Sequence, residues 1–187
     1  MTPRIRPMNR EHPDYEDFQD AVKNLSHSTW DERYSAVNVL SAIGHPEAIT
    51  HLAVQKQGLR DEEIMIREQS FRAIVKIVDA INASQPKHPA LKIALEHLFK
   101  PGQGINDPSV WVRERNAKSL GKIADVIKAS RPDHPAVIAV THINPEQHPK
   151  AFIALYEALA KGEHLGQPPA WLTTTAKQLK ALEGNLK

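Results

Sequence analysis

The sequence predicts an all-α protein, an α-α superhelix in which helical pairs stack as a short solenoid. The 187 residues are 41% hydrophobic but only 5% aromatic, which favours helix-on-helix packing over a β-sandwich. Apolar residues also recur at steps of three and four, the spacing of a buried helix face. Finally, part of the sequence repeats itself along the chain, which is typical of stacked supersecondary units.

The internal repeat appears when the chain is aligned with itself at an offset of 46 residues. Residues 83–90 then lie on residues 129–136, and six of the eight positions are identical. The same offset aligns Arg67 with Arg113, and a shorter offset of 34 aligns Arg33 with Arg67. Repeats of roughly this length are typical of helical pairs, each of which must stack on a neighbour to bury its apolar face. At least three related repeats are therefore predicted.

The buried faces can be assigned element by element. Residues 13–25 are predicted to form a helix that caps the first repeat, with one apolar face made by Tyr15, Phe18, Val22 and Leu25. The first helix of each repeat has the same spacing, in the series Arg33, Val37, Leu40, Ile43, then Arg67, Phe71, Ile74, Ile77, Ile81, then Arg113, Ala117, Leu120, Ile123, Ile127.

Turn-forming residues mark the helix boundaries. Asp61 and Asp107 are predicted to act as N-caps, Pro108 to lie in a first helical turn, and Gly44 to end a helix. Each second helix is predicted to open at a His-Pro pair, because the fixed φ of proline suits a first turn. These pairs are His45-Pro46, His88-Pro89, His134-Pro135 and His148-Pro149.

The predicted organisation is one repeat domain with two flanks. Residues 1–12 are expected to form a basic, flexible segment, and residues 13–161 the repeat domain with its capping helix. Residues 162–169 are expected to form a Gly/Pro linker. Residues 170–187 are expected to form a C-terminal helix that carries Trp171.

Composition narrows the function classes. The absence of cysteine excludes disulfides, zinc–thiolate sites and thiol nucleophiles. The sequence has no signal peptide and no apolar stretch of membrane-spanning length, so a cytoplasmic protein with no membrane contact is expected. Five of the ten histidines precede proline and no HExxH motif occurs, so neither a metal nor another cofactor is predicted. No catalytic residue can be named, and an enzyme is not expected.

The sequence also resembles a known family. Residues 42–49, followed by Leu52, resemble the helix-turn-helix unit of HEAT repeats, in the subtype named for phycobilisome lyases. Residues 107–113 resemble the Asp-Pro-x-Val-x-x-Arg opening of the same unit, and the resemblance covers roughly residues 28–161. The resemblance implies a solenoid, but HEAT arrays serve as scaffolds, adaptors and a few enzymes, so it does not imply one function.

The main functional hypothesis is a non-enzymatic scaffold or adaptor that binds another protein or peptide on its concave face. The second helices usually line that face in helical-pair solenoids, and here they are polar and mildly basic, which suits an acidic partner. The C-terminal helix is a second expected contact. The predicted partner-binding residues are His51, Gln55, Lys56, Lys92, His97, Lys100, Lys150, Tyr156 and Trp171.

Three arginines recur at matching repeat positions: Arg33, Arg67 and Arg113. The family resemblance suggests a ladder of salt bridges with acidic residues of neighbouring repeats, such as Asp61. The alternative hypothesis assigns these arginines to phosphate contacts, because guanidinium forks also match phosphate oxygens. Trp30 and Trp111 lie next to them, as in HEAT-like DNA glycosylases, so nucleic-acid binding is the rival function. A bilin lyase subunit is a third, resting on the repeat resemblance alone.

Overall fold

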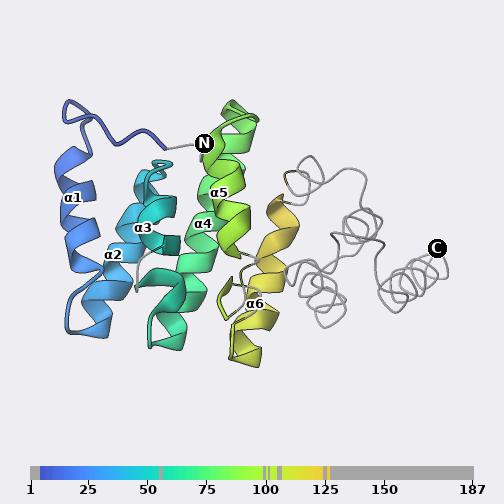
Figure 1. Ribbon diagram of the computed structural model, residues 1–187. Helices are drawn as coiled ribbons and strands as arrows, with labels where there is room; N and C mark the ends of the chain where they lie inside the picture. The colour runs from blue at the N-terminus through green and yellow to red at the C-terminus, as the bar shows by residue number, and fades with distance from the viewer. Residues whose placement is uncertain are drawn as a thin grey trace. The chain divides into compact units, whose positions relative to one another are not determined.

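Every element that the structure describes is a helix. The structure is a computed structural model that describes residues 5–54, 57–98, 100, 102–104, 107–123 and 126 (Figure 1). No strand occurs in these ranges, so the prediction of an all-α fold of packed helical pairs is confirmed. The chain divides into two compact bodies, Met1–Leu98 and Phe99–Lys187.

The first body consists of two helical pairs and one preceding helix. Its elements are α1 (Tyr15–Asn24), α2 (Trp30–Ile43), α3 (Ala48–Val54), the short 3-10 helix η1 (Gly58–Arg60), α4 (Ile64–Ser84) and α5 (Pro89–Leu98). The first helices α2 and α4 pack against each other, and so do the second helices α3 and α5. Helix α1 packs on α2. Two helical pairs are thus stacked as a HEAT-like solenoid requires.

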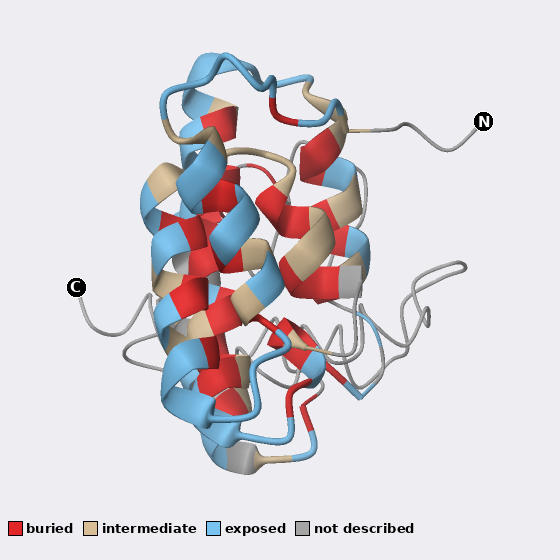
Figure 2. Cartoon of the chain, turned by 90° about the vertical axis from the view of Figure 1, so that its left-hand side faces the viewer, coloured by how far each residue is buried: buried red, intermediate tan, exposed pale blue. Residues whose placement is uncertain are grey.

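The core lies between these helices, as Figure 2 shows by the buried residues on their facing sides. On α2, Val37 and Leu40 are fully buried, whereas Ile43 is half-buried. Phe18 on α1 and Leu25, which directly follows α1, are fully buried. The third buried position is Ala21, since Val22 is half-buried. The small Ala21 side chain allows α1 to approach α2 closely.

Helix α4 is the central element of the first body. The expected stripe of Phe71, Ile74, Ile77 and Ile81 is buried, and Arg67 is half-buried. Further residues between these positions are also buried, among them Val75 and Val78. The buried surface is wider than one stripe because α4 packs against α2 on one side and against α3 and α5 on another.

The helix boundaries confirm some of the predicted turn residues and shift others. Gly44 ends α2 with a left-handed φ of 71°, and its N–H donates to the carbonyl of Leu40. Helix α5 begins at Pro89 as predicted, whereas α3 begins at Ala48, two residues after Pro46. The N–H groups of the first three residues of α3 each donate to the carbonyl three residues earlier. The third and fourth His-Pro pairs, His134-Pro135 and His148-Pro149, lie outside the described residues.

The N-terminal segment is attached to the second helix of the first repeat. The side chain of Met8 is only 5% exposed, and its backbone N–H donates to Glu47 Oε2 at 2.6 Å. Lone Met8 belongs to no apolar pattern in residues 1–12, which is why this contact has no signal in the sequence.

The described part of the second body contains α6 (Val110–Leu120) and the 3-10 helix η3 (Gly121–Ile123). Ile123 is buried as predicted. Pro108 precedes α6 instead of lying in its first turn. Ile127 and residues 162–187 fall outside the described residues, and the predicted linker and C-terminal helix stay predictions. Of the described helices, none is long and apolar enough to cross a membrane.

Candidate functional site

Arg33, in the first turn of α2, forms a buried ion pair with the loop before α4. Its Nε donates to Asp61 Oδ2 at 2.9 Å and its Nη2 donates to Asp61 Oδ1 at 3.0 Å, a bidentate pair. Arg33 is 7% exposed and Asp61 is 5% exposed. The hydrogen bonds that Arg33 donates to Asp61 raise the pKa of Arg33, against the opposing effect of burial. The pair joins the first helix of one repeat to that of the next.

The remaining donors of Arg33 are also occupied. Nη1 donates to the carbonyls of His27 and Ser28 at 3.0 and 3.2 Å, and Nη2 donates to Glu62 Oε1 at 3.3 Å. A guanidinium has about five N–H groups, and those of Arg33 all have acceptors in the protein. The salt-bridge interpretation is therefore confirmed for Arg33, and the phosphate alternative has no donor left at this residue.

The two other repeated arginines make the same local contact. Arg67 Nη1 donates to the carbonyls of Asp61 and Glu62 at 2.9 and 3.0 Å. Arg113 Nη1 donates to those of Asp107 and Pro108 at 2.7 and 3.3 Å. As with Arg33, the acceptors lie six and five residues before the arginine, so each arginine holds the loop that leads into its own helix. The ladder partner of Arg67 stays a prediction.

The two repeated aspartates shape the same loops, although neither is an N-cap. Asp61 Oδ1 accepts the N–H of Glu63 at 2.9 Å, and Asp107 Oδ1 accepts that of Ser109 at 2.8 Å. These bonds close turns just before α4 and α6. The N-cap position of α4 is Glu63. The prediction of backbone acceptors was correct, but their position was wrong by two residues.

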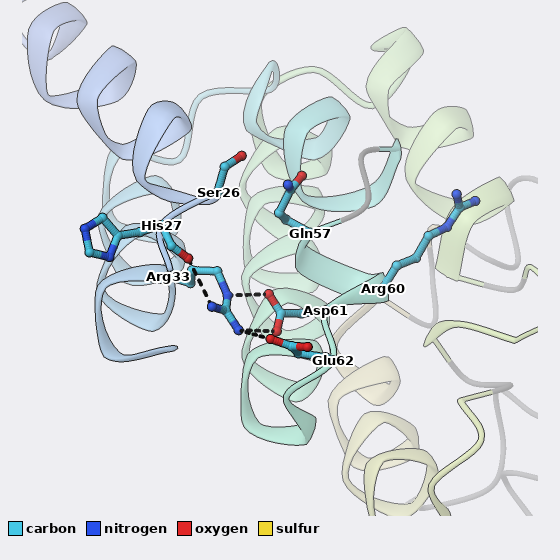
Figure 3. A pocket seen from close by; sticks show the side chains of 7 residues that line it. All are labelled: Ser26, His27, Arg33, Gln57, Arg60, Asp61 and Glu62. Atoms are coloured by element: carbon cyan, nitrogen blue, oxygen red, sulfur yellow. Dashed lines mark hydrogen bonds and ion pairs between the residues drawn. The ribbon is translucent and has the colours of Figure 1, made fainter. Parts of the chain in front are cut away.

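Arg33 and Glu62 line two open pockets. The larger, of about 460 Å³, is drawn in Figure 3, where Arg33 points toward Asp61 and Glu62. Its lining residues are Ser26, His27, Arg33, Gln57, Arg60, Asp61 and Glu62. The smaller, of about 350 Å³, is lined by Ser28, Thr29, Trp30, Asp31, Arg33, Glu62 and Glu63. Both pockets are lined by residues before and within the first turn of α2 and by residues of the segment that leads into α4.

Large apolar side chains are exposed at the same helix starts. Trp30, the first residue of α2, is 50% exposed, and the first two residues of α4, Ile64 and Met65, are 46% and 56% exposed. We call these three residues, together with the acidic residues Asp31, Glu62 and Glu63, the loop edge. Exposed apolar groups of this size commonly mark interaction sites when they lie together.

The loop edge carries negative charge. The Glu62 side chain is 82% exposed even though one oxygen accepts from Arg33. A hydrogen bond from the Thr29 side chain lowers the pKa of Asp31, so this carboxyl stays ionised well into the acidic range. The loop edge therefore combines exposed apolar side chains, Trp30 and Met65 among them, with carboxylates that line a pocket together with Trp30.

The structure describes four of the predicted partner-binding residues: His51, Lys92, His97 and Lys100. His51 is directed at α1, because its ring lies 5.9 Å from that of Phe18 and its Nε2 lies 3.7 Å from Glu47 Oε1. Lys92 is exposed, and its Nζ lies 4.0 Å from Glu96 Oε1, which offsets its charge. His97 is half-buried and Lys100 is exposed. The other predicted residues lie outside the described residues: Gln55, Lys56, Lys150, Tyr156 and Trp171.

Sequence reasoning missed most of the loop edge. In the sequence Trp30 stands out only beside Arg33, in the nucleic-acid hypothesis, and Ile64 and Met65 belong to no predicted buried stripe. One feature of the sequence does indicate them. Ile64 and Met65 are apolar residues that come directly before the predicted buried stripe of α4 but do not belong to it. The 46-residue offset aligns Met65 with Trp111, which is 67% exposed in the second body.

The three described histidines before proline close turns that lead into helices. In His12, His45 and His88 the ring Nδ1 accepts the backbone N–H of the residue two further on, at 3.2 Å in each case. For His45 this bond requires an unprotonated Nδ1, because an imidazole nitrogen accepts a hydrogen bond only when it carries no proton. In the described residues no group of three or more histidines, cysteines, aspartates or glutamates is placed to hold a metal ion.

The hydrogen bond that the His45 ring accepts from the N–H of Glu47 predicts a pH-dependent stability. Burial lowers the pKa of His45, with smaller contributions from His12 and His88, against the opposing charge of Glu47. Since the folded pKa lies below the unfolded value of about 6.5, the stabilisation is complete above about pH 6.5. It is lost as pH falls below that value and through the folded pKa. We expect His45→Asn, whose side-chain oxygen keeps an acceptor without titrating, to reduce this acid sensitivity while changing stability at pH 7.5 by less than about 1 kcal/mol.

Urea unfolding at pH 7.5 and at pH 5.5 measures this effect. The urea concentration at the unfolding midpoint should fall less between pH 7.5 and pH 5.5 in His45→Asn than in the wild type. An equal loss in both proteins would show that other groups cause the acid sensitivity.

Comparison with known proteins identifies one segment. Residues 32–53 match the family model described as PBS lyase HEAT-like repeat. This segment covers most of α2, the Gly44 turn and nearly all of α3, which is one complete helical pair. No curated protein and no solved structure matches the chain. The resemblance noted in the sequence is thus confirmed for the first repeat.

Proposed function

We propose, on the premise that this chain contains HEAT-like repeats of the PBS lyase type, that it is an adaptor that binds another protein through its loop edge. The premise rests on the matched helical pair and on its stacking against a second pair. HEAT-like arrays present extended surfaces to partners, which supports a protein-interaction role. The observation that carries the proposal is the exposure of three large apolar side chains at two neighbouring helix starts: Trp30, Ile64 and Met65.

Burial of these side chains supplies a driving force for association. Tryptophan and methionine are enriched in protein interfaces, and truncation of a central tryptophan often removes much of the binding free energy. Their exposure in the free protein is not required by the fold, because the core under α2 and α4 is already filled by Val37, Leu40 and Phe71. A partner that covers Trp30 and Met65 would remove this apolar surface from water.

The second-helix surface expected to line the concave face is a weaker candidate within the described residues. Lys92 is offset by Glu96, and His51 packs toward α1. Nucleic-acid binding is also less well supported, because carboxylates surround Trp30 and the donors of Arg33 are already occupied. The second-helix surface can be compared with the loop edge in one experiment.

The test is capture of partners from native extract on the immobilised full chain. The double variant Trp30→Ser/Met65→Ser removes the apolar part of the loop edge, whereas Lys92→Ser/Glu96→Ser removes an exposed pair on α5. We expect the first variant to retain its partner at least about tenfold less than the wild type, and the second to retain it fully. Circular dichroism checks that both variants stay folded.

Equal recovery on the wild type and on the loop-edge variant would overturn the proposal. Loss on the α5 variant alone would instead place the contact on the second helices.

A further inference from the structure

We propose that the pocket beside Trp30 receives an arginine or lysine side chain of the partner protein, so that the partner segment is basic. This inference rests on the proposed function and specifies the partner. It starts from the pocket of about 350 Å³ that lies between the loop before α2 and the loop before α4. Three features of its lining point to a cation: the charge, the half-exposed indole and the neutralised arginine.

The charge of the lining is negative. Three carboxylates, those of Asp31, Glu62 and Glu63, line the pocket together with one guanidinium, that of Arg33. Arg33 is already compensated by Asp61, with which it makes two charge-assisted hydrogen bonds. An incoming cation therefore meets a guanidinium already neutralised by Asp61 and three carboxylates, of which Glu62 engages Arg33 through one oxygen.

The indole supplies a second kind of contact. Trp30 lines the same pocket and is half exposed, so part of its side chain is available to a group that enters. A guanidinium or ammonium over an indole is attracted by its ring quadrupole, and tryptophan is the most effective residue for this contact. The methylene stem of arginine or lysine would also cover part of the exposed apolar surface.

The acidic residues alone would not support this assignment. Carboxylates near helix starts are stabilised by the helix dipole, which accounts for Asp31 at the start of α2 and for Glu63 at the start of α4. The dipole does not account for the exposed indole beside them. Charge complementarity at an apolar site thus favours a basic partner, opposite in sign to the acidic one expected from the second-helix surface.

A peptide titration of the full chain tests the inference. The probe is a hexapeptide of alternating leucine and arginine, and its control has citrulline, which is neutral and similar in shape, in place of arginine. The readout is the fluorine resonance of Trp30 in protein labelled with 5-fluorotryptophan, assigned with Trp30→Phe. We expect the arginine peptide to shift this resonance and the citrulline peptide to bind at least about tenfold more weakly.

Matched variants separate local charge from net charge. Asp31→Asn/Glu62→Gln/Glu63→Gln should weaken the arginine peptide at least about tenfold. The control variant Asp20→Asn/Asp79→Asn/Glu96→Gln makes the same change in net charge away from the pocket and should leave binding within about twofold. Equal binding of the two peptides, or an equal loss in the two variants, would overturn the inference.

The proposed function fails by a different result. If Trp30→Ser/Met65→Ser abolishes partner capture but the three neutralising substitutions at the pocket do not, the loop edge binds a partner that is not basic. If the double substitution leaves capture unchanged, the docking site itself is wrong.

Discussion

Replacing Arg33 by methionine is expected to lower the free energy of unfolding by about 3–5 kcal/mol. The substitution leaves the Asp61 carboxylate 5% exposed without its bidentate partner, and an unpaired buried charge is among the most costly defects in a protein. It also removes the donors that hold the carbonyls of His27 and Ser28. Urea unfolding followed by circular dichroism measures the change.

Two further variants identify the cause of this loss. Arg33→Met/Asp61→Asn should be more stable than Arg33→Met, because asparagine removes the buried charge but keeps the acceptor for the N–H of Glu63. Lys92→Met removes a positive charge from an exposed pair and should cost less than about 1 kcal/mol. If Arg33→Met costs no more than Lys92→Met, the ion pair does not couple the two repeats.

Replacing Gly58 by alanine is expected to destabilise the first body by about 2–5 kcal/mol. Gly58 begins η1 with a left-handed φ of 67°, which costs a residue with a Cβ about 1–2 kcal/mol. A Cβ there would also lie 2.8 Å from the carbonyl carbon of Leu52 and 2.9 Å from its Cα, closer than Cβ atoms are found. Leu52 is fully buried, so α3 has no space in which to move away.

Gly44 provides the matched control for this prediction. It has nearly the same φ, 71°, but a Cβ at Gly44 would meet only the carbonyl oxygen of Ala42, at 3.9 Å. Gly44→Ala should therefore cost only the backbone strain, about 1–2 kcal/mol. The thermal or urea unfolding midpoints of the two variants separate the cost of backbone strain from the cost of the close approach to Leu52. Similar losses of stability in both variants would show that the contact with Leu52 is unimportant.

The fold was largely predictable because the buried positions follow a simple period. Val37 and Leu40 on α2, and Phe71, Ile74 and Ile77 on α4, recur at steps of three and four and are buried as expected. Local chemistry also gave the left-handed helix end at Gly44. The boundaries were less predictable, because Asp61 forms its turn two residues before the cap position of α4.

The candidate site was less predictable because it depends on contacts between distant residues. Arg33 and Asp61 are 28 residues apart, and the sequence left open whether that arginine pairs with protein or with phosphate. His51 has a polar side chain and was predicted to lie on the binding surface, yet it packs on Phe18 of α1. Trp30 and Met65 are exposed because they stand at helix starts before the buried stripes, and only the packed helices bring the two starts together.

Photo-crosslinking at position 65 tests the central claim most directly. Benzoylphenylalanine in place of Met65 puts a reactive ketone on the loop edge, and the same residue in place of Lys92 puts it on the exposed side of α5. Irradiation of each full chain in native extract should give a partner adduct from position 65 that disappears when Trp30 is replaced by serine. An adduct from position 92 but not from position 65 would contradict binding through the loop edge.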